Sequence, residues 1–442
     1  MTKTIAPMTS GSIWKRMTFF AMPIFLGNLF QQLYNTVDSL IVGNFLGSSA
    51  LAAVSSSGSL IFMLIGFLSG IASGAGVIVA RFFGAGDEKN LQHAVHTTVA
   101  FGLVAGILMT GVGVAFSPQI LMWMDTPESV MAESVTYLQI YFAGSLGFVM
   151  YNILVGILQA VGDSRHPLYY LIVSSVINLI LDLVFITGMH TGVGGAAVAT
   201  VISQVVSAIL CFWELLRTKE SYGVNISKIR FDKGILKQII KIGLPSGVQN
   251  SIIAFANVIV QSNINAFGEM AMAGYGAYTK VEGFGFLPIN SFTMALTTFV
   301  GQNLGAKQEE RTRKGARFGI FVTVILAELI GIVVFIFAPQ LIAAFDSSPE
   351  IIAFGVGKAR TAALFYCLLA FSHSIAAILR GAGKTMVSMI IMMMCWCVIR
   401  VSFLSVMIPL THSIQVVYWV YPLTWSLSSL AFFWYYKKSK WI

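Results

Sequence analysis

Long apolar segments follow one another along almost the whole chain and are separated by short polar loops. A helix needs about 20 apolar residues to cross about 30 Å of hydrocarbon, and each segment reaches that length. The pattern predicts twelve membrane-spanning helices. Their expected ranges are 18–45, 50–83, 92–117, 133–160, 167–188, 194–216, 238–267, 270–303, 315–340, 358–380, 385–409 and 414–436.

The composition agrees with this pattern. Hydrophobic residues make up 57% of the chain and charged residues 10%, whereas a soluble domain has about 25% charged residues. A soluble fold is therefore excluded, and no stretch is left for a separate soluble domain. The first residues are polar and basic and lack a small-residue cleavage site after a short apolar core, so we expect no removable signal peptide.

The net charge of +9 is explained by topology. The loops of one side, together with both termini, hold 23 of the 27 Lys and Arg residues. By the positive-inside rule we expect both termini in the cytoplasm of a multi-pass protein of the plasma (bacterial inner) membrane. This distribution argues against a nucleic-acid partner. The opposite loops are acidic and contain Asp125, Glu128, Glu269, Asp346 and Glu350.

The chain repeats itself at an offset of 221 residues. Gly84 and Ala85 recur as Gly305 and Ala306, and similar pairs follow further along the chain. Because each half has six spans, both halves enter the membrane in the same direction. The fold class predicted is an all-α polytopic membrane protein with two six-helix lobes, related by a pseudo-two-fold axis along the membrane normal. The expected division is 1–216, a cytoplasmic linker 217–241 that includes a short amphipathic helix, and 242–442.

Four acidic residues lie inside predicted spans, namely Asp38, Asp182, Glu282 and Glu328. A charge at the centre of a membrane helix costs about 2.5–3.5 kcal/mol on insertion scales, and such residues are functional candidates by default. Glu328 has an ordinary packing explanation and is left out of the predicted site. Glu282 has an alternative explanation as a local pair with Lys280.

The acids of the first half belong to polar helix faces. The spacing of three, four and three residues puts four side chains on one face of the first helix, and Asn178 and Asp182 share a face of the fifth. The first face consists of Asn28, Gln31, Asn35 and Asp38.

Carboxylates with amide oxygens suit a hard cation, and two neighbouring carboxylates favour uptake of a proton. Both alternatives imply a small-cation site. The other explanation is simple hydrogen bonding between helices. The second half argues against it, because the positions equivalent to Asp38 and Asp182 are Val260 and Phe403.

Four motifs together resemble the multidrug and toxic compound extrusion (MATE) family over essentially the whole chain, and the DinF-like branch in particular. They are PIFLGNLFQQLYNTVDSLIVGNFLGSSALAAV, VARFFGAGD, ILQAVGDSRHP and GLPSGVQN. The resemblance implies an antiporter that exports hydrophobic organic cations in exchange for protons or sodium ions by alternating access. It further implies an ion-coupling site, and sodium ligands, at Asp38, Asn178, Asp182 and Thr200.

By the same resemblance, Gln31, Tyr137 and Asn152 line the first-lobe cavity. We add Asn35 and Glu282 as candidate substrate-binding residues because both are polar groups inside spans. We expect no cofactor other than a bound sodium ion, membrane lipid as surroundings, and a monomer. The neutral Val260 puts an ion site in the second lobe in doubt.

Two alternatives remain. The first is a flippase for a lipid-linked oligosaccharide or lipid with the same fold, which needs basic groups in its cleft for phosphate. Intramembrane bases are few in this sequence. The second is an intramembrane enzyme, which we do not expect because no HExxH or Gly-x-Ser-x-Gly motif is present.

Overall fold

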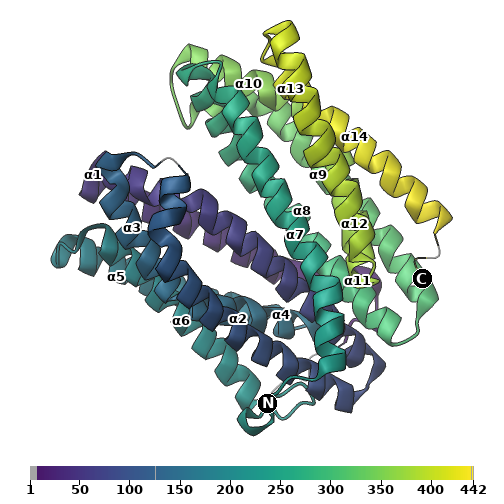
Figure 1. Cartoon of the computed structure of the whole chain (residues 1–442). Coiled ribbons are helices and arrows are strands. Elements are labelled where there is room, and N and C mark those ends of the chain that lie inside the picture. Colours follow the sequence, from purple (N-terminus) through teal and green to yellow (C-terminus); the bar gives the residue numbers. More distant parts are fainter. Residues whose placement is uncertain (1–6, 125, 440, 442) are drawn as a thin grey trace. The chain divides into compact units, whose positions relative to one another are not determined.

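The computed structural model describes residues 7–124, 126–439 and 441, but not the side chains of 48, 49, 51–53, 55–60 and 62. Asp125, one of the predicted acidic loop residues, lies outside the described residues. All regular structure that is described is helical (Figure 1).

Helix α1 (Ile13–Ala85) is 73 residues long. At 1.5 Å per residue it would measure about 110 Å if straight, several times the thickness of a hydrocarbon core. Gly47 interrupts it with φ 88° and ψ −179°, a conformation that glycine adopts readily. The element therefore contains two membrane spans, as the apolar pattern predicts.

The other spans of the first half are equally regular, with two local deviations. Helices α3 and α4 are bent by 49° at Gly144 and together make one span. Helix α5 passes directly into the π-helical turn η1. The bounds are α2 (Glu88–Trp123), α3 (Glu128–Ala143), α4 (Ser145–Ala160), α5 (Arg165–Asp182), η1 (Leu183–Gly188) and α6 (Gly192–Arg217).

The second half has the same kind of bent span, because α10 and α11 meet at 57°. A second π-helical segment, η3, lies between α12 and α13. The bounds are η2 (Ile226–Lys228), α7 (Lys233–Asn265), α8 (Glu269–Gly305), α9 (Glu309–Ala343), α10 (Pro349–Ala363), α11 (Tyr366–Gly381), α12 (Thr385–Met392), η3 (Met393–Ile399), α13 (Arg400–Thr411) and α14 (Gln415–Lys438).

The structure supplies up to eleven of the twelve predicted spans. Among the described residues, nine helices are long and apolar enough to cross a membrane, and the two bent pairs each supply one more span. The part of α1 that precedes Gly47 is helical and stays the predicted first span. The predicted all-helical polytopic fold is confirmed.

The repeat is visible in the backbone as well as in the sequence. Left-handed φ angles recur at an offset of 221 residues, where each half makes the same turn. Such angles strain residues with a Cβ atom, and the pairs are mostly glycines. They are Gly47 with Gly268, Gly86 with Lys307, and Gly162 with Gly383.

The chain packs into two compact units. Among the described residues, the first comprises 7 and those within 26–243, and the second comprises 8–25 and those within 244–441. The start of α1 belongs to the second unit because the chain before it is held there. The backbone N–H of Met8 donates to Gln302 Oε1 at 2.8 Å, and Arg311 Nη2 donates to the Met8 carbonyl at 2.9 Å. The predicted division into an N-terminal lobe (1–216), a linker (217–241) and a C-terminal lobe (242–442) stays a prediction.

The linker packs with the first unit. The N–H of Val224 donates to the carbonyl of Leu215 at 2.8 Å. The amphipathic segment predicted in the linker is helical, but it is continuous with α7. Its Ile235 and Ile239 are 4% and 0% exposed, respectively, so its apolar face is packed on protein.

Small residues let helices of the first unit approach closely. A Cβ atom on Gly74 would lie 2.3 Å from the Cα of Gly243, and one on Gly113 would lie 2.2 Å from the ring of Phe142. Such close packing is typical of membrane helices, where apolar burial does not drive association. Large apolar side chains such as Leu108, which is 61% exposed, face outward as lipid contact requires.

Candidate functional site

The predicted acid pair lies inside the first unit, where α1 meets α5. Asp182 is the last residue of α5, immediately before the π turn η1, and π turns often occur at functional sites. Its side chain is 0% exposed. Asp38 of α1 is partly buried and lies within hydrogen-bonding distance of Asp182.

Each of the two carboxyl groups keeps one oxygen without a protein partner. Oδ1 of Asp38 and Oδ1 of Asp182 are buried and form no hydrogen bond with any of the described residues. No described Lys or Arg forms an ion pair with either group. Two carboxylates this close in an apolar surrounding repel each other, and a buried unpaired charge is costly. The pair therefore requires a proton or a cation.

Asn178 and Thr200 complete the predicted set. In the amide orientation that satisfies both partners, the Asn178 side-chain nitrogen donates to Asp182 Oδ2 at 3.0 Å, and its oxygen accepts from the Thr200 backbone N–H at 3.2 Å. Thr200 Oγ1 donates to the Ala196 carbonyl at 3.0 Å. The four residues predicted for ion coupling thus lie together, drawn from α1, α5 and α6.

Two tyrosines, Tyr34 and Tyr137, lie near the acids, and a third stacks on Tyr137. The sequence prediction included one of the three. Tyr137, 6% exposed, stacks on Tyr141 with 6.4 Å between ring centroids. Tyr34 contacts the Thr200 side chain through a hydrogen bond, and its hydroxyl lies near both acids. The signal that could have found the missed tyrosines is spacing. Tyr34 is four residues before Asp38 and Tyr141 four residues after Tyr137, so each shares a helix face with a predicted residue.

The remaining predicted residues of the first unit lie outside this contact network. Asn152 on α4 donates to the Phe148 carbonyl at 2.9 Å and lies 3.5 Å from Ser69 Oγ. Asn35 is exposed and Gln31 partly buried. Among the described residues, no hydrogen bond or ion pair joins these three to the acid pair, and their role as substrate contacts stays a prediction.

In the second unit, Glu282 on α8 belongs to a different kind of cluster. Tyr278 Oη donates to Glu282 Oε1 at 2.6 Å, and the hydroxyls of Tyr278 and Tyr366 are 3.1 Å apart. The alternative of a local pair with Lys280 is not what the described residues form. The Lys280 Nζ lies instead 5.5 Å from the ring centroid of Phe345.

Two buried bases accompany Glu282 and act on it electrostatically. Lys358 is 0% and Arg400 2% exposed. Both contact the Tyr421 ring, whose centroid is 3.4 Å from Lys358 Nζ and 4.4 Å from Arg400 Cζ. Such cation–π contacts strengthen when desolvated. The sequence does not indicate that Lys358 is buried. It is the first residue of a predicted span, a position where a base is typical of a loop.

An all-helical polytopic fold with internal repeats and a buried, unneutralised acid pair defines a membrane transporter. The sequence model of the MatE family matches residues 23–184 and matches again at 245–406. The chain belongs to this family of MATE transporters and is not an enzyme. The predicted family is thereby confirmed, and assignment to the DinF-like branch stays a prediction.

Curated relatives cover nearly the whole chain. It is 30% identical over 434 residues to the probable multidrug resistance protein YoeA of Bacillus subtilis, covering 96% of this chain and 94% of that protein. It is 26% identical over 388 residues to the probable multidrug resistance protein NorM of Thermotoga maritima, covering 86% and 82%.

Solved structures share the fold. One, described as the outward-facing conformation of a multidrug resistance MATE family transporter of the MOP superfamily, has a TM-score of 0.92 at 23% identity and covers 99% of this chain and 98% of that chain. A MOP superfamily transporter from Pyrococcus furiosus gives 0.91 at 23% identity, covering 99% and 100%. At these identities the likeness concerns the fold alone.

Proposed function

We propose that the protein is a cation-coupled multidrug efflux antiporter of the DinF-like branch, which exports hydrophobic organic cations in exchange for protons or sodium ions. The curated relatives are named as multidrug resistance proteins, which supports export of varied compounds. The observation that carries the coupling is the acid pair of Asp38 and Asp182, each with a buried oxygen that lacks a protein partner.

The pair is suited to exchange because its negative charge is compensated only by a proton, a sodium ion or a cationic drug that enters the site. A proton on the pair, or a sodium ion held by carboxylate, amide and hydroxyl oxygens, neutralises the two acids and weakens their attraction for a cationic drug. Loss of that ion restores the negative charge. Drug and ion then compete for one charge, and competition at a site that opens alternately to each side produces exchange.

Tyrosine rings give the site the apolar surface that an organic cation needs. Tyr137 and Tyr141 stack on each other beside the acids, and aromatic faces attract cations as well as apolar bodies. We assign substrate contacts to Tyr137 first, with Gln31, Asn35 and Asn152 on neighbouring helix faces. Glu282 is the corresponding proposal in the second unit, since it is only partly buried.

The membrane placement follows the charge distribution. We propose a monomer in the plasma (bacterial inner) membrane with both termini cytoplasmic, on the basis of the 23 of 27 bases on one side. Membrane lipid surrounds its exposed apolar faces.

The flippase alternative has one observation in its favour. Lys358 and Arg400 are buried bases, of the kind that a phosphate requires. Both are engaged, however, by Tyr421 and by Glu282, whereas the acid pair has no basic partner among the described residues. We therefore favour cation export over lipid-phosphate transport.

Single substitutions of the acids test the proposal. Asp38→Asn and Asp182→Asn keep the shape of each side chain and remove its charge. In cells that lack other efflux pumps, each should abolish ethidium efflux while leaving membrane expression intact. Glu328→Gln is the matched control, because Glu328 is also an acid inside a span but belongs to α9 of the second unit. Undiminished efflux by both Asp variants would refute the proposed role.

A further inference from the structure

A polar cavity of about 530 Å³ lies in the first unit, away from the acid pair. It is formed by the first turns of α2 and by the linker that follows α6. The α2 wall contributes Lys89, Gln92, His93, His96 and Thr97, and the linker wall contributes Ser227, Lys228, Arg230 and Asp232. Neither wall belongs to the proposed transport site, so the cavity needs a separate explanation.

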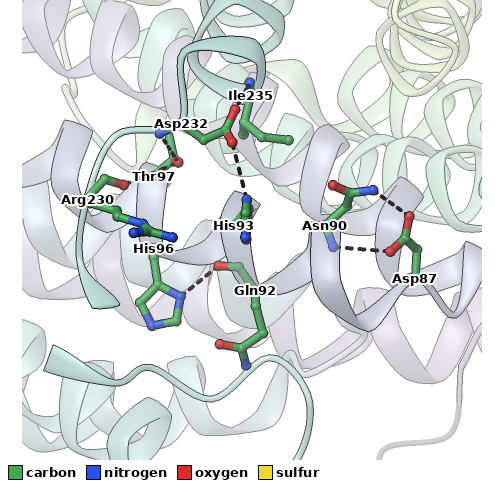
Figure 2. A network of polar contacts seen from close by, with 9 residues as sticks. All are labelled: Asp87, Asn90, Gln92, His93, His96, Thr97, Arg230, Asp232 and Ile235. Atoms are coloured by element: carbon green, nitrogen blue, oxygen red, sulfur yellow. Dashed lines mark hydrogen bonds and ion pairs between the residues drawn. The ribbon is translucent and has the colours of Figure 1, made fainter. Parts of the chain in front are cut away.

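Hydrogen bonds hold the linker against α2, as Figure 2 shows. The backbone N–H of Asp232 donates to Thr97 Oγ1 at 3.0 Å, and its carboxylate lies 3.2 Å from His93 Nδ1. The N–H of Asn225 donates to His96 Nε2 at 2.9 Å. These contacts fix the linker wall before any ligand arrives, and preorganisation reduces the cost of binding.

The two histidines belong to the walls rather than to the ligand-binding groups. Because His96 Nε2 accepts a hydrogen bond from the Asn225 N–H, its Nδ1 donates to the Gln92 carbonyl, 2.7 Å away. Both ring nitrogens of His96 are therefore occupied, and the residue is 3% exposed. His93 is directed toward Asp232 (Figure 2).

The charged groups that remain available are positive. Lys89, Lys228 and Arg230 are exposed, and among the described residues none forms an ion pair with an acid. The one acid of the cavity, Asp232, is already occupied. Hydrogen bonds from the Ile235 N–H and from His93 hold the pKa of its carboxyl below the ordinary value of 3.8. Lys228 and Arg230 thus present charge with which no described acid forms an ion pair, whereas Lys89 acts on the nearby Asp87.

Two apolar side chains on the linker point outward beside these cations. Ile226 is 64% and Phe231 44% exposed, and they flank Lys228 and Arg230 in the sequence. Exposed apolar groups next to bases are typical of segments that lie at a membrane interface. The position fits, because α2 and α7 both enter their apolar stretches within a few residues of the cavity.

We propose that this cavity binds the phosphate group of an anionic lipid headgroup from the surrounding membrane. Lys228 and Arg230 contact the phosphate, with Lys89 opposite, while Ile226 and Phe231 lie against the acyl region. On the predicted cytoplasmic side the leaflet is rich in anionic lipid, and basic pockets at this depth bind such headgroups. The inference is independent of the proposed transport function.

Lipid binding to the purified full-length protein tests this site. Native mass spectrometry would compare phosphatidylglycerol with zwitterionic phosphatidylcholine for the wild type and for Lys228→Gln/Arg230→Gln. Each base near an anionic surface contributes about fivefold in affinity, so the double variant should lose about 25-fold for phosphatidylglycerol and little for phosphatidylcholine. The control Arg313→Gln/Lys314→Gln, which removes the same charge from exposed positions of α9, should retain wild-type affinity.

Competition experiments distinguish a lipid headgroup from a free phosphate as the ligand. Glycerol 3-phosphate and inorganic phosphate at millimolar concentration should not displace the lipid, and Phe231→Ser should weaken lipid binding without the charge change. Equal losses in both double variants, or displacement by inorganic phosphate, would overturn the proposal. Because Lys228 and Arg230 are exposed, both double variants should remain monodisperse. A salt titration of the wild type, in which binding must weaken as salt rises, provides a test that needs no variant.

Discussion

The two halves of the chain bury charge in opposite ways on the same backbone. In the first unit, Asp38 and Asp182 lie together, and among the described residues they have no basic partner and keep two oxygens without a hydrogen bond. In the second, Glu282 lies near two bases, Lys358 and Arg400, which both contact the ring of Tyr421. Since the left-handed turns recur at one offset, the fold itself does not require either arrangement.

The difference separates two roles for buried charge. A cluster that contains both signs compensates part of its charge with side chains that the protein itself supplies. A cluster with one sign stays incomplete until an ion enters, which is the property a coupling site needs. We therefore propose ion exchange in the first unit and regard the second cluster as the counterpart whose acid already has basic neighbours.

The largest expected effect is on the stability of the second unit. Glu282→Gln keeps the shape of the side chain but leaves the buried bases Lys358 and Arg400 without the acid that acts on them, and an uncompensated buried charge costs about 3–5 kcal/mol. Unfolding of the purified variant should show this loss. Adding Lys358→Met, which removes one of the two bases, should recover part of it. If the single variant is as stable as wild type, Glu282 does not compensate the two bases.

The acid pair should respond in the opposite direction. Asp182→Asn removes one of two like charges, whose repulsion at about 4 Å is about 1 kcal/mol even in water. We expect the unfolding free energy without added sodium to stay unchanged or to rise by about 1 kcal/mol, although efflux is lost. The unfolding assay used for the second unit measures this free energy at neutral pH. A strongly destabilised Asp182→Asn protein would mean that the pair is structural.

A smaller effect is expected from the polar groups around the pair. Tyr34→Phe removes the hydroxyl that contacts the Thr200 side chain, and one such hydrogen bond contributes about 1 kcal/mol. The concentration of ion needed for half-maximal exchange should rise about fivefold, with the maximal rate nearly kept. The matched control is Tyr436→Phe on α14, which should leave the ion concentration for half-maximal exchange unchanged. Equal shifts in both variants would contradict a local role for Tyr34.

The smallest expected effect lies outside both clusters, at Asp232. Its folded pKa is below the ordinary value, so its contribution to holding the linker is fully present above about pH 4 and is lost as pH falls through the lowered value. The hydrogen-exchange protection factors of residues 225–235, which correct for the pH dependence of the intrinsic rate, should stay high at neutral pH and fall in acid. In Asp232→Asn they should be low at both. Unchanged protection in Asp232→Asn would contradict the role of this carboxylate.

The sequence was sufficient for the fold and for the acid pair for physical reasons. Apolar length sets the spans, and an acid inside a span is costly enough to stand out, as Asp38 and Asp182 do. Spacing on helices then placed Asn178 beside Asp182, and the resemblance supplied Thr200.

Contacts between helices that are distant in the sequence could not be predicted. Nothing in the sequence near Lys358 reveals that Tyr421, more than sixty positions away, covers its charge. Tyr34 looked like an ordinary aromatic residue of a membrane helix. The continuity of the linker segment with α7 was missed because Lys237 and Lys241 made it resemble a surface helix.

Exchange in proteoliposomes tests the central claim most directly. Purified wild type, Asp38→Asn/Asp182→Asn and Glu328→Gln would be reconstituted with ethidium, and a sodium gradient and a pH gradient would be imposed separately. We predict that at least one gradient drives ethidium movement by the wild type and by Glu328→Gln, and that neither gradient drives it through the double variant. Gradient-driven movement by the double variant at the wild-type rate would contradict the account.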